Sequence, residues 1–394
     1  MKRALLVGSS FSAAPIFFLL KKRGIHVSVC GRLKSDPCHQ YSDASFYIDY
    51  SNRDALLRLV ESEKFDYIVP TCNDYSYMSC AWFAKQWGYS GFDGFDVASI
   101  IHNKNKFRLF TQQYSLPAPR ANWQNGDAPI DVSGLKYPLL VKPVDSFSGR
   151  GVTKVLDVSQ IEVAVEAARQ ASRSREIVLE EFVDGALHSH SAFIHDQEIV
   201  VDFFVDEFCT VYPYQVNCSN HPSRLATTIQ GSVRATMLQV VKLLGLQDGL
   251  LHTQFMVKGD QYWIIECMRR CPGDLYGSLI ERSTASRYMD YYVRPFIGEV
   301  ISCSSKTEVY KPIGRHTISA QNPMATYTFT HTIPASRVQI TPLKNSGERM
   351  EAAPFDKLAI LFAEFQDEST MLEVTPRFAE FVCIESLEGV YLEN

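Results

Sequence analysis

The stretch that decides the fold is LLVKPVDSFSGRGVTKV, residues 139–155. An apolar run ends in Lys142, and a loop of small residues holding Gly149 and Gly151 leads into a second apolar run. Backbone N–H groups in such a loop can bind a phosphate. A Walker-type loop is excluded, because that motif places the lysine after the glycines and continues into a helix. The order here predicts a flap over a phosphate, and a plain β-hairpin with a glycine turn is the alternative.

The composition is that of an ordinary globular chain of several structural units. Its 394 residues are 46% hydrophobic and 21% charged, which predicts two to four units. A net charge of -5 provides no general attraction to nucleic acid or to an acidic membrane, so neither is expected as a partner. The ten cysteines form no C-x-x-C pair and no zinc spacing. We therefore expect reduced thiols and a cytoplasmic protein.

The first hundred residues predict a Rossmann-like α/β domain. Strand-like and helix-like segments alternate there, which is typical of a parallel sheet covered by helices. The apolar run 4–20 is not expected to anchor the chain, because Gly8, Pro15 and several serines interrupt it and it is short for a membrane span. The first turn lacks the G-x-G-x-x-G fingerprint, which disfavours a nicotinamide-dependent oxidoreductase.

The middle of the chain predicts a mixture of helices and strands. A helix that begins near 102 should stop before Pro117. A second helix follows the flap, and Ser159 with Glu162 has the spacing of a capping box at its start. Two antiparallel strands are expected at 250–259 and 261–268, and short strand-like runs follow residue 300.

The order of the charged motifs resembles the ATP-grasp superfamily. A lysine opens a helix, a second lysine precedes a glycine flap, an acidic strand end follows, and an acid and an arginine stand in IIECMRR; these are Lys104, Lys142, Glu180–Glu181, Glu266 and Arg270. Within the superfamily, the chain is most similar to the carboxylate–amine ligases typified by biotin carboxylase, carbamoyl-phosphate synthase and the L-amino-acid ligases. The resemblance implies a Rossmann-like domain at 1–101, a two-lobed ATP-grasp domain at 102–300 with its flap lobe at about 118–184, and a β-rich portion at 301–394.

The resemblance also implies an ATP site. The two lysines would contact phosphates, the flap would cover them, and the strand end would receive adenine; the residues are Lys104, Lys142, Ser148, Gly149, Gly151, Glu180, Glu181, Phe182 and Val183. The family often places a glutamate on the ribose hydroxyls, but Leu187 stands at the matching position. Asp184 or Glu180 would have to substitute for it.

The metal site departs further from the family pattern. Glu266 matches the second of two acidic Mg²⁺ ligands, but Gln254 stands where the first should be, and Met268 replaces an asparagine. A glutamine carbonyl can bind Mg²⁺ without adding charge, whereas a thioether is a poor ligand for a hard ion. The site should therefore hold one or two ions, and a further carboxylate could make up the deficit: Asp202, Asp206, Glu207 or Asp274. The sequence does not rank these four.

The implied activity is an ATP-dependent ligation. A substrate carboxylate would become an acyl-phosphate and then react with an amine, releasing ADP and phosphate, with Glu266 and Arg270 as the catalytic residues. The planar guanidinium of Arg270 suits the charge that develops on a transferring phosphoryl group. Gln254 and Met268 suggest the alternative, a non-catalytic ATP-binding protein on a degenerate ATP-grasp frame. The partners would be a small carboxylate and a small amine, and dimers are common among the relatives, which leaves a homodimer open.

Overall fold

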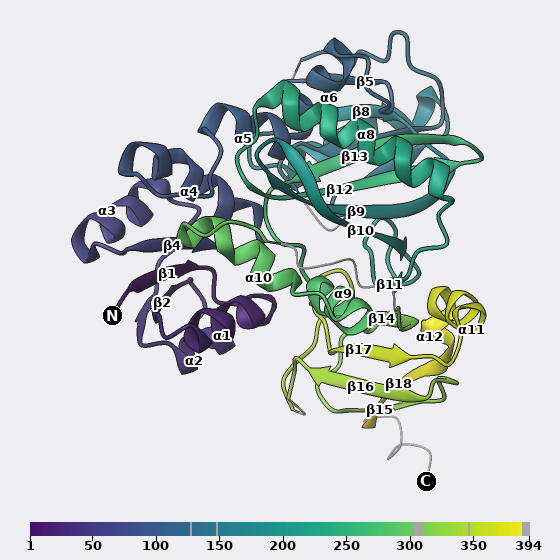
Figure 1. Ribbon diagram of the computed structural model, residues 1–394. Helices are drawn as coiled ribbons and strands as arrows, with labels where there is room; N and C mark the ends of the chain where they lie inside the picture. The colour runs from purple at the N-terminus through teal and green to yellow at the C-terminus, as the bar shows by residue number, and fades with distance from the viewer. Residues whose placement is uncertain (127, 147–148, 303–309, 346, 388–394) are drawn as a thin grey trace.

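The computed structural model describes residues 1–126, 128–146, 149–302, 310–345 and 347–387. Within these residues the chain forms four β-sheets with helices on their faces, which confirms the α/β class (Figure 1). None of the helices in the described part combines the length and apolar composition needed to cross a bilayer.

The N-terminal domain is built on a parallel sheet in the order β3-β2-β1-β4. Its strands are β1 (Arg3–Val7), β2 (His26–Cys30), β3 (Ala44–Phe46) and β4 (Tyr67–Pro70). Its helices are α1 (Ala14–Lys22), α2 (Pro37–Tyr41), α3 (Arg53–Glu63), α4 (Asp74–Trp87) and α5 (Phe95–His102). Strand β1 is almost entirely buried, as its unbroken apolar run requires in a sheet covered on both faces. The expected Rossmann-like arrangement is present.

The flap lobe is a smaller antiparallel sheet in the order β5-β8-β6-β7. Its strands are β5 (Ala121–Gln124), β6 (Leu139–Pro143), β7 (Thr153–Val155) and β8 (Ile177–Glu181), with helices α6 (Lys104–Gln113) and α7 (Ile161–Ala171) beside them. The capping box predicted at Ser159 and Glu162 is wrong. Asp157 accepts a hydrogen bond from the Ser159 N–H and starts a 3₁₀ turn, so α7 begins only at Ile161.

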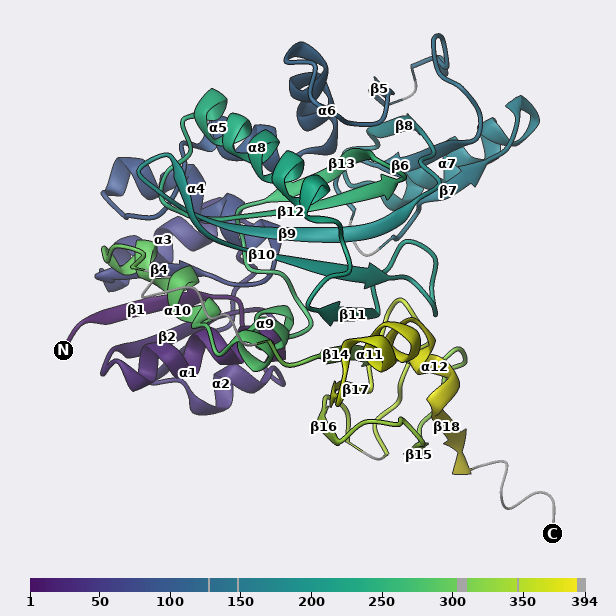
Figure 2. The same ribbon diagram turned by 45° about the vertical axis from the view of Figure 1, so that its right-hand side comes forward.

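The central sheet has the order β13-β12-β9-β10-β11-β14-β17-β16. Its strands are β9 (Ala186–His195), β10 (Glu198–Phe208), β11 (Cys218–His221), β12 (Gly249–Lys258), β13 (Gln261–Met268), β14 (Ile313–Ile318), β16 (Arg337–Pro342) and β17 (Ala359–Glu364). Helix α8 (Thr227–Leu244) covers one face, and the N-terminal domain lies on the other side (Figure 2). The C-terminal portion thus adds β14, β17 and β16 to the edge of this sheet.

The remaining elements join these parts. Helices α9 (Tyr276–Thr284) and α10 (Tyr288–Val293) lie between the central sheet and the N-terminal domain (Figures 1 and 2). Strands β15 (Tyr327–His331) and β18 (Val382–Ser386) form a separate pair next to helices α11 (Glu368–Val374) and α12 (Phe378–Phe381). One hydrophobic core runs from β1 and α1 through α10 to Phe193 and Leu250 of the central sheet, so the N-terminal domain is packed firmly against it.

Two buried histidines should make stability depend on pH. Burial lowers the pKa of His221 and of His316 to about 4, whereas an unfolded histidine titrates near 6.5. Between these values the unfolded chain binds more protons, so the free energy of unfolding falls as the pH drops from about 6.5 toward 4. We expect these two sites to remove roughly 2–4 kcal/mol between pH 7 and pH 5, measured by urea unfolding.

The exposed His331 offers a matched control. His331→Gln should leave the pH dependence unchanged, whereas His316→Gln should reduce it. An equal pH dependence in wild type and His316→Gln would contradict this account.

Candidate functional site

A cleft of about 1960 Å³ lies where the N-terminal domain, the flap lobe and the central sheet meet. Most small-molecule sites have volumes of roughly 300–1,000 Å³, so this cleft has room for a nucleotide and a second ligand. Ten of the predicted site residues line it: Lys104, Lys142, Gly149, Glu180, Glu181, Phe182, Val183, Gln254, Glu266 and Arg270. Gly151 lies at the base of the flap against Pro143 and Ala171. Ser148 lies outside the described residues.

A buried charge cluster joins the two lobes beneath the cleft. Lys142 on β6 donates a hydrogen bond to Glu180 Oε1, and Arg108 on α6 donates to Glu180 Oε2 from Nε and Nη2 at 3.1 and 2.9 Å. Arg108 also donates to the carbonyl oxygens of Ile264 and Ile265 on β13, at 3.2 and 2.7 Å. The flap lobe is therefore fastened to the strand that carries Glu266.

The pKa shifts of this cluster follow from its burial. Burial opposes the charge of Glu180, but Lys142 and Arg108 outweigh it and lower the pKa of the carboxyl to about 2. Burial also lowers the pKa of Lys142, and the Glu180 carboxylate counters that effect. The side chain of Glu180 is thus a structural counter-ion. The idea that it holds the ribose is wrong for this conformation, because both its oxygens are already bound.

The strand end after Glu180 has the geometry of a ligand-binding edge. The Glu181 carboxylate turns outward and accepts a hydrogen bond from the Lys136 N–H at 3.0 Å. The amine of Lys154 lies over the Phe182 ring, 3.6 Å from its centroid. Phe182 and Val183 therefore give the cleft an apolar wall, which fits a flat heterocycle.

The flap already reaches across the cleft. Gly149 has φ +71°, and a Cβ there would lie 2.7 Å from the Pro213 carbonyl oxygen on the opposite side. Arg150 lies over the Phe355 ring at 5.3 Å. On the inner side, Lys104 Nζ donates to the Ser146 carbonyl oxygen at 2.5 Å. A side chain at 149 would force the flap away from the core, which explains the glycine.

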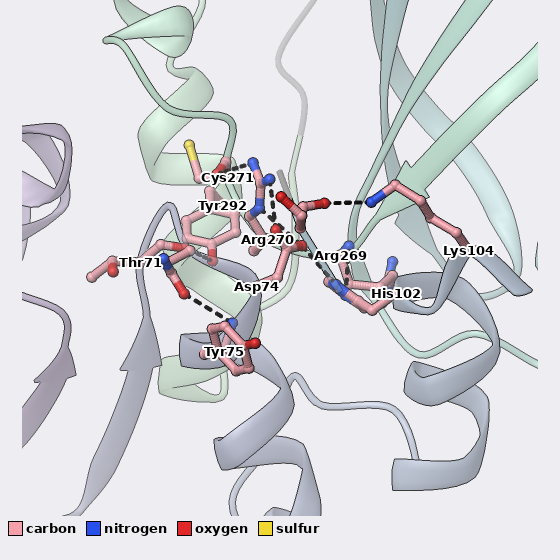
Figure 3. Close-up of polar contacts among 11 residues, drawn as sticks. Thr71, Asp74, Tyr75, His102, Lys104, Arg269, Arg270, Cys271 and Tyr292 are labelled. Carbon is pink, nitrogen blue, oxygen red and sulfur yellow. Dashed lines mark hydrogen bonds and ion pairs between the residues drawn. The ribbon is translucent and has the colours of Figure 1, made fainter. Parts of the chain in front are cut away.

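The arginine of IIECMRR that faces the cleft is held by the N-terminal domain. Arg270 donates from Nε and Nη2 to Asp74 Oδ1 and Oδ2, at 3.2 and 2.9 Å. His102 Nδ1 donates to Asp74 Oδ1 at 2.9 Å, because its Nε2 accepts from the Arg269 N–H at 3.2 Å. Figure 3 shows these side chains converging, with the Lys104 amine pointing toward them. Burial opposes both charges, but their pairing lowers the pKa of Asp74 and raises that of Arg270.

Arg269 has a different role from its neighbour. It is 2% exposed and donates to Asp93 Oδ2 at 2.7 Å and to the carbonyl oxygens of Gln247 and Leu250 at 2.6 and 2.7 Å. It therefore stabilises the packing of the N-terminal domain on the sheet and does not reach the cleft.

The central sheet presents the candidate metal ligands in one row. Gln254 on β12 is paired with Glu266 on β13 and with Ser189 on β9. Gln254 Nε2 donates to Glu207 Oε2 on β10 at 2.5 Å. In the part of the chain that the structure describes, no hydrogen bond or ion pair engages the Glu266 carboxylate. Met268 lies two residues after Glu266 on β13, is buried and lines the cleft.

The structure ranks the four carboxylates that the sequence left open. His190 and Arg234 pair with Asp202, His188 and Ser223 bind Asp206, and Lys357 and Thr317 bind Asp274. Glu207 alone among the four contacts a predicted metal ligand, Gln254. Burial raises the pKa of Glu207, and the Glu266 carboxylate raises it further.

Four residues of this site were not identified as such from the sequence: Arg108, Asp74, His102 and, as a preferred ligand, Glu207. Asp74 has a signal that could have been used, because it follows the carboxyl end of β4, where α/β sheets bind ligands. The other three carry no local pattern, since their partners lie on distant segments.

Comparison with known proteins agrees with this geometry. A sequence model of the ATP-grasp domain matches residues 135–276. The formate-dependent phosphoribosylglycinamide formyltransferase of Methanocaldococcus jannaschii is 24% identical over 330 residues, which cover 80% of each chain. Residues 135–276 are therefore identified as an ATP-grasp domain.

Solved ATP-grasp structures share the whole fold. The L-amino acid ligase from Bacillus licheniformis superposes with a TM-score of 0.79 at 17% identity, over 98% of this chain and 99% of that one. The phosphoribosylglycinamide synthetase from Anaerococcus prevotii gives 0.77 at 17% identity, with the same coverage. The N5-carboxyaminoimidazole ribonucleotide synthetase from Thermotoga maritima gives 0.75 at 15% identity, over 98% and 100%.

ATP and Mg²⁺ are the cofactors of the ATP-grasp family, and the residues present fit both. Lys104, Lys142 and the flap would hold the phosphates, and the edge at 181–183 would hold adenine. Carboxylate and amide oxygens are the donors that Mg²⁺ prefers, and Glu266, Gln254 and Glu207 supply them in one row.

We expect Arg108→Met to destabilise the ATP-grasp fold strongly. The change leaves the Glu180 carboxylate with one cation instead of two and removes the bonds to β13. Breaking a buried ion pair from one side costs roughly 3–5 kcal/mol, which chemical denaturation would measure. Arg58→Met, at an exposed helix position, is the matched control and should change stability little. A loss no larger than that of the control would show that the cluster does not join the lobes.

Proposed function

We propose that this chain is an ATP-dependent ligase that activates a substrate carboxylate as an acyl-phosphate and joins it to an amine. ADP and phosphate are the other products. The main support for the proposal is the position of Arg270. It lies between the nucleotide part of the cleft and the N-terminal domain, with its guanidinium fixed by Asp74.

The residues of the cleft can divide the work of phosphoryl transfer. When bound, MgATP supplies the γ-phosphoryl group and the metal charge. Lys142 and Lys104 neutralise phosphate charge, and Arg270 stabilises the negative charge that develops on the transferred group. The flap around Gly149 excludes water, which would otherwise hydrolyse the acyl-phosphate.

The space beyond Arg270 supports a second substrate. Ser12, Asn73 and Tyr75 of the N-terminal domain line that part of the cleft, and the volume exceeds what a nucleotide alone requires. Asp274 lines the cleft but is poorly suited to bind a substrate amine, because Lys357 and Thr317 already occupy its oxygens. The relatives named above differ in substrate, so the carboxylate and the amine stay open within this class.

The direct test is acceptor-dependent ADP release. The chain is mixed with MgATP and either formate plus glycinamide ribonucleotide or pairs of L-amino acids and small carboxylates. At least one pair should release ADP well above the level with ATP alone. Glu266→Gln should abolish this release and keep its fold. ATP binding without acceptor-dependent release from any pair would favour the non-catalytic alternative.

Asp74→Asn should slow turnover without weakening ATP binding. The change removes the charge that orients Arg270, and losing one group that stabilises developing charge typically costs about 10²-fold in kcat. The KM for ATP should stay within about threefold, because Asp74 pairs with His102 and Arg270 and, among the described residues, with neither phosphate lysine. Asp54→Asn, also in the first turn of an N-terminal helix, is the matched control. Equal kcat values for these two variants would remove Asp74 from the mechanism.

A further inference from the structure

The wall of the cleft carries a buried carboxylate that the family pattern does not include. Glu207 lies near the end of β10 and is 4% exposed. It lines the same cleft as Glu266 and Gln254, and β10 is two strands away from β12 in the sheet. Its cross-strand partner on β9 is Leu187, so its side chain projects from the face that also carries Ser189 and Gln254.

The carboxylate of Glu207 lacks a dedicated cation among the described residues. Its hydrogen-bond partners are neutral, namely Gln254 and Ser189. The charge of Arg315 acts on Glu207, but no hydrogen bond or ion pair joins the two side chains in the described part of the chain. Arg315 donates from Nη1 and Nη2 to the Asp274 carbonyl oxygen and the Ser219 hydroxyl, both at 2.8 Å, and its Nε is buried without a hydrogen-bond partner. A buried carboxylate without a paired cation is costly, and a bound divalent cation would offset that cost.

The amide at position 254 matches this arrangement. A glutamate there would place two carboxylates within hydrogen-bond distance of each other, and like charges at that separation cannot both ionise. Glutamine donates Nε2 to Glu207 and keeps its carbonyl Oε1 available as a ligand atom. Glu207 and Gln254 therefore form a complementary pair. Compared with the family pattern, the carboxylate stands on β10 and not on β12.

We propose that Glu207 is a ligand of the divalent cation, together with Glu266, and supplies from β10 the carboxylate that β12 lacks. Gln254 links the two acids and fixes the position of Glu207. The proposal rests on the nucleotide-binding part of the proposed function and not on the identity of the ligase substrates.

A role for Glu207 on the ribose is the rival interpretation, because Leu187 stands across the strand pair from it. The hydrogen bond to Gln254 favours the metal, since it turns the carboxylate toward the row that ends in Glu266. Gln254 is also the cross-strand partner of Glu266, so the two acidic residues lie on either side of the same glutamine.

The test measures Mn²⁺ binding to the full chain in the presence of ADP, by electron paramagnetic resonance of free Mn²⁺. Glu207→Gln should weaken Mn²⁺ binding at least tenfold and leave metal-free ADP affinity, measured by calorimetry with EDTA, within about twofold. Glu198→Gln, an exposed glutamate at the other end of β10, is the matched control and should bind Mn²⁺ as wild type does. None of these measurements requires turnover, so failure of the ligase assay and failure of this proposal are distinguishable.

A charge exchange separates ligation from a structural role. The double variant Glu207→Gln/Gln254→Glu returns the carboxylate to β12 and keeps a hydrogen bond between the two positions with its direction reversed. Mn²⁺ affinity should recover to within about threefold of wild type. If Glu207→Gln does not fold, Glu207→Asp replaces it, since it keeps the charge and withdraws the oxygens by one methylene; weaker Mn²⁺ binding is again expected.

Three outcomes would overturn the proposal. The first is unchanged Mn²⁺ affinity in Glu207→Gln, or in Glu207→Asp where that variant replaces it. The second is a weakened Mn²⁺ affinity that the charge exchange does not recover. The third is a loss of metal-free ADP affinity with Mn²⁺ binding intact, which would assign Glu207 to the ribose.

Discussion

The buried Glu180 carboxylate is the interaction on which the cleft depends. It accepts hydrogen bonds from Lys142 on the flap lobe and from Arg108 on α6, and Arg108 also binds two carbonyl oxygens of β13. One carboxylate therefore sets the position of Lys142, the proposed phosphate lysine, and fastens it to the strand that carries Glu266. Glu180, Lys142 and Arg108 are buried, so hydrogen bonds within the protein, and not solvent, fix the geometry of this charged group.

A second constraint crosses the boundary of the N-terminal domain. Asp74 begins α4 and holds Arg270, which follows β13, while His102 at the end of α5 orients Asp74. The N-terminal domain thus completes the site by positioning an arginine as well as by walling the cleft. The N-terminal domain and the central sheet share one hydrophobic core, which holds the two parts together and so maintains the Asp74–Arg270 contact.

In the metal site that we propose, a carboxylate is supplied from a different strand than in the family pattern. In the sequence, Gln254 stands in place of an acidic metal ligand and Met268 in place of an asparagine, so the family motif looks incomplete. In the folded sheet, Glu207 lies against Gln254, so the number of acidic groups facing the cleft is maintained. A sequence motif that covers only β12 and β13 does not include Glu207. Glu207 and Gln254 lie far apart in the chain, so their contact is visible only in the folded sheet.

The sequence alone determined the α/β class, the Rossmann-like start and the ATP-grasp order of lysine, flap, strand end, acid and arginine. These features are local: they depend on apolar periodicity, on glycines, and on residue order along single strands. Tertiary structure alone decided that Glu180 is a counter-ion for Lys142, that Asp74 and His102 hold Arg270, and that Glu207 is the carboxylate beside Gln254. Each of these pairs joins segments distant in sequence, and burial determines its energy, which no local pattern encodes.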